Sequence, residues 1–183
     1  MANALIVLAE GFEDIEAVTT IDVLRRGGVE VTIASLASSP DVTSAHQLAL
    51  KADTTFAAAA EATYDVIVLP GGPGTQLLAE SEALLARLNR QKEDGRLIAA
   101  ICAAPTVLEK AGVLEADQHV TCYPTCCNQM NRECADVPVV TDGLIVTGQA
   151  PGASLLFALV VLQTLLGERA AQRVAEGLVT DVY

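Results

Sequence analysis

The chain has 183 residues and a mass of 19.0 kDa, about the size of one domain. Hydrophobic residues make up 51% of it, which excludes an intrinsically disordered chain. Its 11 basic and 23 acidic residues give a net charge of −12. Nucleic acids and anionic membrane surfaces attract basic proteins, so neither is an expected partner. We therefore predict one globular domain over residues 1–183.

The cysteines and the apolar runs indicate the cellular compartment in which we expect the protein. The chain begins with an apolar run that no basic segment precedes, unlike a secretory signal peptide. Its longest apolar run, residues 155–166, is too short to cross a bilayer. We therefore expect a cytoplasmic protein whose five cysteines are reduced thiols and not a disulfide framework.

Short β-branched runs alternate with helical patterns along the chain. Strands are predicted at 5–8, 29–36, 65–69 and 96–101, with a marginal strand at 47–52 and a hairpin at 137–140 and 144–147. Helices are predicted at 13–26, 56–62, 76–93, 103–111, 153–166 and 168–177, and a loop at 37–44. This alternation predicts an α/β fold with a mainly parallel sheet and helices on both faces.

In such folds, sites form at the carboxyl ends of the parallel strands. Three loops should therefore converge there: residues 10–16, 71–75 and 102–104.

Cys102 directly follows the strand predicted at 96–101 and precedes a helix that starts near Pro105. This pattern is typical of a nucleophile elbow, in which a sharp turn lifts one side chain above the sheet. Free amides and the dipole at the helix start favour a thiolate, so we expect a pKa below the usual value of about 8.5. The alternative is that Cys102 is a small buried hydrophobic residue, as free cysteines often are.

Glu16 is the acidic residue of the first helix that we expect to face the sheet. Glu13 and Asp14, just before it, are expected only to favour the helix dipole. A carboxyl buried beside a thiolate has a raised pKa and keeps its proton. Glu16 is therefore a candidate hydrogen-bond donor to the sulfur, or a proton carrier acting as acid or base.

A glycine-rich loop, residues 71–74, follows the strand at 65–69. It lacks the phosphate-binding patterns G-x-G-x-x-G and G-K-[ST], and we predict no cofactor. We expect instead that the backbone amides of Gly72 and Ala103 form an oxyanion hole near Cys102. The alternative is an ordinary tight turn.

Four segments together resemble the ThiJ/PfpI superfamily, and within it the branch of the Parkinsonism-associated protein deglycase. They are ALIVLAEGFEDIEAVTTIDVLRRGGVEVTIASL, YDVIVLPGGPG, RLIAAICAAPTVLEKAGVL and DGLIVTGQAPGASLLFALVVLQTLLG. The resemblance implies a flavodoxin-like three-layer sandwich of the class I glutamine amidotransferase type, and a homodimer. It also implies a reactive Cys102 with Glu16 as its protonated partner, amides from Gly72 and Ala103, and a site wall at Pro151-Gly152. We place Gly71 in the same pocket.

Activities implied by the resemblance include deglycation of methylglyoxal- or glyoxal-modified groups, glyoxalase activity without glutathione, and redox-dependent chaperoning. We therefore predict a cysteine-dependent stress-response protein that acts on reactive α-oxoaldehydes or their adducts. Cys102 would be the nucleophile and Glu16 its proton partner. The alternative is an oxidative-stress sensor or chaperone that works through sulfinic acid formation at Cys102.

The sequence departs from the family pattern at several positions. Tyr123 stands where the family's usual catalytic histidine would fall, and a phenol carries protons less readily than an imidazole at neutral pH. Ala103 replaces the histidine that follows the cysteine in the protease-like branch, so peptidase activity is not supported. His46 stands where relatives often place an arginine that reaches the partner subunit's site. We expect Tyr123 and His46 to line the pocket, and His119 to be structural or exposed.

The other cysteines, Cys122, Cys126, Cys127 and Cys134, are unusually close in sequence. No C-x-x-C pair is present, and we predict unpaired thiols, some of them facing the Cys102 pocket, and no bound metal. A soft-metal site stays open as an alternative, and so does a resolving role for Cys122 or Cys126 toward an oxidised Cys102.

Overall fold

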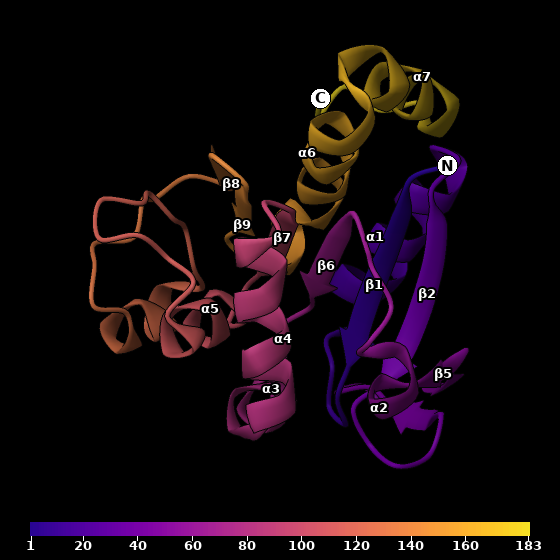
Figure 1. Ribbon diagram of the computed structural model, residues 1–183. Coiled ribbons are helices and arrows are strands. Elements are labelled where there is room, and N and C mark those ends of the chain that lie inside the picture. The colour runs from indigo at the N-terminus through magenta and orange to yellow at the C-terminus, as the bar shows by residue number, and fades with distance from the viewer.

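The computed structural model describes residues 1–183 and has a seven-stranded sheet at its centre (Figure 1). The strands lie in the order β5-β2-β1-β6-β7-β9-β8, and all neighbours are parallel except β8 and β9. Their bounds are β1 Asn3–Leu8, β2 Glu30–Ser35, β5 Thr54–Thr55, β6 Val66–Leu69, β7 Leu97–Ile101, β8 Val139–Asp142 and β9 Ile145–Gly148.

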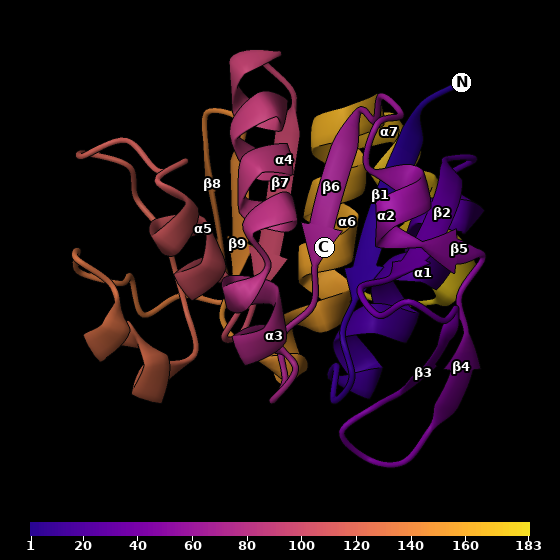
Figure 2. The same cartoon turned by 60° about the horizontal axis from the view of Figure 1, so that its bottom comes forward.

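Helices cover both faces of this sheet, which confirms the predicted mainly parallel, flavodoxin-like sandwich (Figures 1 and 2). One face carries α1 (Asp14–Arg26), α6 (Ser154–Leu166) and α7 (Glu168–Leu178). The other carries α2 (Phe56–Ala59), α3 (Thr75–Glu80), α4 (Glu82–Glu93) and α5 (Pro105–Ala111). In Figure 2, α4 lies in front of the sheet and α6 behind it. No helix combines the length and the apolar character needed to cross a membrane.

The continuous apolar strands follow from burial on both faces. Along β1, Ala4, Ile6 and Leu8 pack into the core under α1 and α6. Leu5 and Val7 point the other way, into the core under α4 and α5. Successive side chains of a strand alternate between faces, so a strand with a core on each side has no polar position.

The structure corrects the predicted elements in three places. The helix predicted at 76–93 is two helices, because Ser81 is extended and its side chain accepts a hydrogen bond from the Leu84 amide, which starts α4. The loop predicted at 37–44 contains β3 (Asp41–Thr43), which pairs antiparallel with β4 (Ala49–Lys51). The marginal strand therefore belongs to a separate two-stranded hairpin and not to the main sheet (Figure 2).

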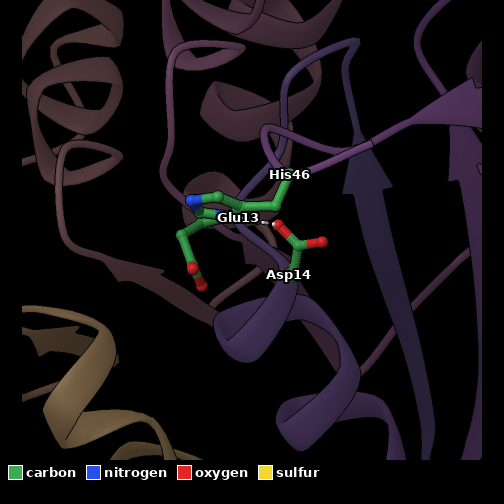
Figure 3. A group of neighbouring side chains, drawn as sticks. All are labelled: Glu13, Asp14 and His46. Carbon is green, nitrogen blue, oxygen red and sulfur yellow. Dashed lines mark hydrogen bonds and ion pairs between the residues drawn. The ribbon is translucent and has the colours of Figure 1, made fainter. Parts of the chain in front are cut away.

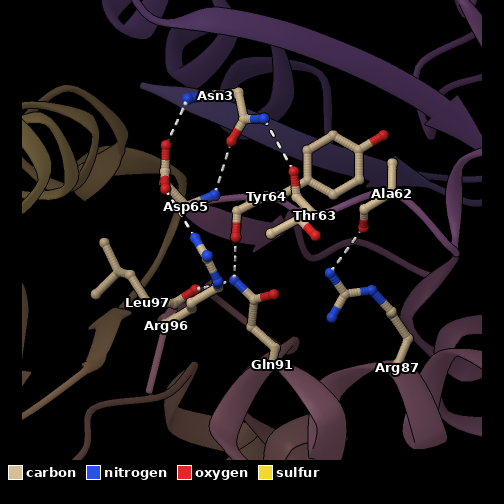
Figure 4. A network of polar contacts seen from close by, with 9 residues as sticks. All are labelled: Asn3, Ala62, Thr63, Tyr64, Asp65, Arg87, Gln91, Arg96 and Leu97. Atoms are coloured by element: carbon tan, nitrogen blue, oxygen red, sulfur yellow. Dashed lines mark hydrogen bonds and ion pairs between the residues drawn. The ribbon is translucent and has the colours of Figure 1, made fainter. Parts of the chain in front are cut away.

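A polar network fixes α4 against the start of β6 and β7 (Figure 4). The buried Gln91 side chain donates to the carbonyls of Tyr64 and Leu97 at 3.0 and 3.1 Å. Arg87 donates to the Ala62 carbonyl at 3.2 Å. These bonds give backbone carbonyls near the starts of β6 and β7 a partner on α4, and so hold the helix against the two strands.

The carboxyl ends of β1, β6, β7 and β9 lie at one edge of the sheet. From β1 the chain continues to β2 on one side, whereas β6 and β7 follow on the other. At such a change of direction, the loops after neighbouring strands diverge and leave a crevice. The loops after β1, β6 and β7 meet at this edge.

Candidate active site

Cys102 is the turn residue between β7 and α5, and its backbone is strained. Its φ of 64° is in the left-handed region, which costs a non-glycine residue about 1–2 kcal/mol. Hydrogen bonds hold this conformation from both sides. The Cys102 amide donates to the Gly148 carbonyl at 2.9 Å, and its carbonyl accepts from the Tyr123 amide at 2.8 Å. The predicted sharp strand-to-helix turn is therefore present.

Glu16 reaches the same place from α1, with no exposed surface. The side chain of Glu13 accepts a hydrogen bond from the Glu16 amide at 2.8 Å and so caps the start of the helix. One carboxyl oxygen of Glu16, Oε2, accepts from the Gly71 amide at 2.6 Å. The carboxyl and the Cys102 side chain both flank Gly71, and Glu16 raises the pKa of the Cys102 thiol. The second oxygen, Oε1, is buried without a hydrogen-bond partner.

Gly71 fits between these two side chains because it has no Cβ. A Cβ added there would lie 2.7 Å from the Cβ of Cys102 and 2.9 Å from Oε2 of Glu16. The next residue, Gly72, has φ of +88°, and a Cβ on it would lie 2.6 Å from the Gly11 carbonyl oxygen. The glycine-rich loop therefore allows three segments of the chain to approach one another closely.

The backbone amides of Ala103 and Gly72 lie near the sulfur of Cys102 and lower the pKa of its thiol. The structure thus brings together Cys102, Glu16, Gly71, Gly72 and Ala103, from the three loops predicted to converge. Two amides that lie near one sulfur also lie near the place where an oxygen would develop negative charge during attack by that sulfur.

The protonation of this pair differs from our expectation for Cys102. Burial raises the pKa of Glu16 from 4.5 to about 7. Burial, together with the charge and the hydrogen bond of Glu16, raises the pKa of the Cys102 thiol to about 12, although the Ala103 and Gly72 amides lower it. The predicted lowering is wrong because the thiol is only 7% exposed and faces a carboxylate. As the pH rises through neutrality, the Glu16–Cys102 pair therefore loses one proton, which comes from the Glu16 carboxyl.

Glu13, Asp14 and His46 form a group at the start of α1 (Figure 3). Asp14 accepts from the exposed His46 ring at 2.8 Å and from the hydroxyl of Ser44. Burial acts to raise the pKa of Asp14, but these two hydrogen bonds, a backbone hydrogen bond and the charge of His46 together lower it. The group therefore ties the loop that carries His46 to the helix that carries Glu16.

The remaining predicted pocket residues lie around the elbow. The Tyr123 side chain is partly exposed, and its backbone amide supports the Cys102 carbonyl. Pro151 and Gly152 form a short 3-10 turn just after β9, the strand that pairs with β7. His119 is exposed beside Asp142, as predicted, with 3.3 Å between Nδ1 and the carboxylate oxygen.

A groove of about 630 Å³ begins at Ala103, the residue after Cys102. Most of its lining residues are polar; the full lining is Thr75, Gln76, Ala79, Ala103, Thr106, Glu109, Lys110, Cys126, Gln129 and Asn131. None of Gly71, His46, Tyr123, Pro151 and Gly152 lines it. The groove could not be predicted from the sequence, because one wall comes from a 3-10 helix, Pro124–Gln129, whose only sequence signal is a proline at its start.

All five cysteines are free thiols. The one group of three or more metal-type ligands in the protein is Glu13, Asp14 and His46, so the clustered cysteines do not form a preassembled metal site. The Cys122 thiol donates to the Cys102 carbonyl at 3.2 Å. It therefore meets the backbone of Cys102, whereas the Cys102 sulfur faces Glu16.

Residues 2–164 match the DJ-1/PfpI family. The chain belongs to this family. It is 40% identical over 180 residues to protein dj-1beta of Drosophila melanogaster, covering 96% of each chain. It is 37% identical over 169 residues to the glutathione-independent glyoxalase DJR-1.2 of Caenorhabditis elegans, covering 90% of this chain and 89% of that protein.

Solved structures of DJ-1 proteins share the whole fold. Toxoplasma gondii DJ-1, described as oxidized, matches with a TM-score of 0.95 and 35% identity, covering 99% of this chain and 100% of that one. Drosophila melanogaster DJ-1beta matches with a TM-score of 0.93 and 39% identity, covering 98% of each chain. The family resemblance predicted from the four sequence segments is confirmed.

Replacing Gly71 by alanine is expected to lower the free energy of unfolding by about 1–3 kcal/mol, because the new Cβ overlaps Cys102 and Glu16. Urea denaturation would measure this change. Gly152→Ala is the matched control, since a Cβ there meets nothing within 4 Å, and we expect its effect to stay within about 0.5 kcal/mol. Equal effects of the two substitutions would contradict the tight packing at Gly71.

The raised pKa of Glu16 predicts how stability depends on pH. The folded protein keeps the proton up to about pH 7, whereas the unfolded chain releases it near 4.5. This contribution to stability is complete below pH 4.5 and is lost as the pH rises to about 7, a loss of about 3 kcal/mol. We expect the unfolding free energy of Glu16→Gln, relative to wild type, to rise over that interval. A pH-independent difference between the two proteins in urea denaturation would refute the raised pKa.

Proposed function

We propose that this DJ-1/PfpI protein is an enzyme that uses Cys102 as a nucleophile on α-oxoaldehydes such as methylglyoxal, or on the adducts they form. The observation that carries the proposal is the buried contact between Glu16 and Cys102. A base acts best when its pKa is near the working pH, and Glu16 has a pKa of about 7. The pair therefore provides a nucleophile with its own base.

In the first step the Cys102 thiol attacks the aldehyde carbon while its proton moves to the Glu16 carboxylate. A carbon–sulfur bond forms, and the carbonyl π electrons move to oxygen. The amides of Gly72 and Ala103, which already lie near the sulfur, would stabilise this oxyanion. Glu16 then returns its proton to the oxygen, which leaves a neutral hemithioacetal and a carboxylate ready for the next transfer.

In the second step Glu16 removes the proton from the former aldehyde carbon, which the neighbouring ketone makes acidic. Returning that proton to the ketone carbon, while the hydroxyl proton moves to the former ketone oxygen, converts the hemithioacetal into a 2-hydroxy thioester. Water then hydrolyses the thioester, releases the hydroxy acid and restores the thiol. The sum is methylglyoxal plus water giving lactate, so no cofactor or external oxidant is consumed. Glu16 carries every internal proton transfer, and the mechanism requires none from Tyr123.

Similarity to other proteins supports this proposal. The relative from Caenorhabditis elegans is named a glutathione-independent glyoxalase, and it covers most of this chain. The polar groove that begins at Ala103 offers room for a carrier larger than a free aldehyde, which fits adducts as well as free oxoaldehydes.

Oxidation of Cys102 is the second candidate function. Unpartnered Oε1 of Glu16, when protonated, would donate a hydrogen bond to a sulfinate oxygen on Cys102. The Toxoplasma gondii structure described as oxidized is a relative of this chain. A gain of two oxygen atoms confined to the Cys102 peptide after mild peroxide treatment, in a protein inert toward methylglyoxal, would favour this role over the enzyme.

We infer that two copies of the chain associate through the outer side of α1. Ile15 and Val18 are 56% and 44% exposed there, an apolar pair one helical turn apart. The loop with His46 and the 44% exposed Leu48 is tied to the start of α1 through Ser44 and Asp14. A second copy over this surface would cover the apolar side chains and bring its own loop close to the site.

Wild-type protein is expected to consume methylglyoxal, with kcat/KM rising about tenfold per pH unit below pH 7 and levelling off above it as Glu16 ionises. Cys102→Ser should lower the rate by at least about 100-fold, and so should Glu16→Gln, which should also abolish the rise with pH. Loss of the aldehyde and formation of lactate would be followed together.

The control for this assay is Cys134→Ser, which removes a thiol far along the chain from Cys102 and should leave the rate unchanged. Equal activity of wild type, Cys102→Ser and Glu16→Gln would show that the reaction does not use the pair. That result would contradict the proposed function.

The dimer is tested by sedimentation equilibrium. We expect wild type to sediment as a dimer and Val18→Glu as a monomer, because a buried unpaired carboxylate opposes association. Leu144→Glu is the control, since Leu144 is about as exposed but lies at the turn between β8 and β9. A monomeric wild type, or dissociation by both substitutions, would contradict the assigned surface.

A further inference from the structure

The 122–134 segment contains four of the five cysteines, and the fold gathers them behind the elbow. Residue 134 is brought back beside the start of the segment by a bridge between Val120 and Cys134, and the Ala135 amide donates to the Val120 carbonyl at 2.8 Å. The 3-10 helix, Pro124–Gln129, carries Cys126 and Cys127 over the same place. Three of the thiols pack against the core under α5.

Cys127 and Cys134 are neighbours in this cluster, and both pack against the core under α5. The Cys127 side chain helps to raise the pKa of Cys134. The Cys127 thiol also lies 3.8 Å from the Cys122 carbonyl and 3.6 Å from the Tyr123 carbonyl, which directs it inward over the segment. Both residues are partly exposed, so a molecule as small as a peroxide can reach them.

We propose that Cys127 and Cys134 are a redox modification site, which a peroxide converts from a dithiol to an intramolecular disulfide independently of Cys102.

The other cysteines are directed elsewhere. Cys122 is buried, and its thiol donates to the Cys102 carbonyl. The Cys102 sulfur faces Glu16 at the other side of the elbow. Cys126 is adjacent to Cys127 but lines the polar groove. Adjacent cysteines rarely bridge each other, because the bond requires a specific geometry. Cys134 is therefore the partner left for Cys127.

The loop between the two cysteines is held in its middle. The Arg132 side chain donates to the Glu109 carboxylate at 2.7 Å and to the carbonyls of Glu115 and Gln118 at 2.7 and 3.0 Å. This anchor keeps residue 134 near residue 127 in the reduced protein. Because both residues already pack against the same core cluster, closing the bond requires a local shift and no refolding of the sheet.

The reaction balances with one peroxide. The Cys127 sulfur attacks a peroxide oxygen, the O–O bond breaks, and Cys127 becomes a sulfenic acid as the first water leaves. The Cys134 sulfur then attacks the Cys127 sulfur, the S–S bond forms and the S–O bond breaks. The released hydroxide takes the Cys134 proton and leaves as the second water. Two thiols lose two electrons, and hydrogen peroxide is reduced to two molecules of water.

We assign the first step to Cys127 because burial disfavours the thiolate form of Cys134. Burial, followed by the hydrogen bond and charge of Cys127, raises the pKa of Cys134 to about 12. A thiol that keeps its proton is a poor attacking group toward peroxide. Cys134 therefore acts as the resolving sulfur.

The test uses full-length Cys102→Ser protein, so that Cys102 neither consumes peroxide nor exchanges with the new bond. After treatment with one equivalent of hydrogen peroxide, we expect the intact mass to fall by two hydrogen atoms. Trypsin cuts after Arg132, between the two cysteines, so without reductant the disulfide should join the peptides on either side of that cut. Fragment-ion spectra should place the link at Cys127 and Cys134.

Three further variants in the Cys102→Ser background sharpen the result. Cys126→Ser is the matched control, next to Cys127 and similarly partly exposed, and it should retain the linked peptide. Cys134→Ser should lower the linked product to below a tenth and leave a sulfenic acid on Cys127 that dimedone traps. Cys127→Ser should form neither product. Circular dichroism would confirm that each variant is folded.

The proposal is overturned if the link involves Cys122 or Cys126, if it joins two chains, or if both residues gain oxygen without linking. None of these results depends on methylglyoxal turnover, because Cys102 is absent from every protein in the test.

Discussion

The buried contact between the Glu16 carboxyl and the Cys102 sulfur is the interaction on which the proposed chemistry depends. Each group would keep its ordinary pKa in water, but together at the sheet edge they have little solvent to stabilise a charge. Burial and the charge of Glu16 outweigh the amides of Ala103 and Gly72, so the thiol is not a standing thiolate. The first negative charge in the pair arises on Glu16 near pH 7, and attack requires the proton of the thiol to move to it.

The fold maintains this contact by holding three separate segments close together. Glu16 is positioned by the capped start of α1, Gly71 by the end of β6, and Cys102 by a strained turn after β7. The strain is maintained because the neighbouring β9 and the Tyr123 amide bind the backbone of Cys102. A parallel sheet brings strand ends that are far apart in sequence to one edge, so such a site is within reach of this architecture.

Two groups of sulfur atoms lie on opposite sides of the elbow. Cys102 faces Glu16 and the two amides, whereas Cys122 and Tyr123 hold its carbonyl from behind. Cys127 in turn lies over the carbonyls of these two residues. The chemistry proposed for the two groups differs for a physical reason. Cys102 has the Glu16 carboxylate near it as a base, so the Glu16–Cys102 pair suits proton transfer. Cys127 has the Cys134 thiol near it, so the Cys127–Cys134 pair suits oxidation to a disulfide.

The sequence by itself determined the sheet, most of the helices, the family and the elbow. Continuous apolar runs such as 5–8 and 66–69 have one stable arrangement, burial on both faces of a parallel sheet, and a cysteine between a strand and a helix start marks a turn. Only the tertiary structure decided whether the Cys102 sulfur is a thiol or a thiolate at neutral pH. The effect of burial on a pKa depends on what surrounds the sulfur, and Glu16 and Gly71 come from distant parts of the chain. It also decided the break at Ser81, the groove beside Ala103 and the packing of Cys127 and Cys134 against one core cluster. These features depend on local capping and on side chains that meet across loops with no periodic pattern, so neighbouring residues in the sequence carry little information about them.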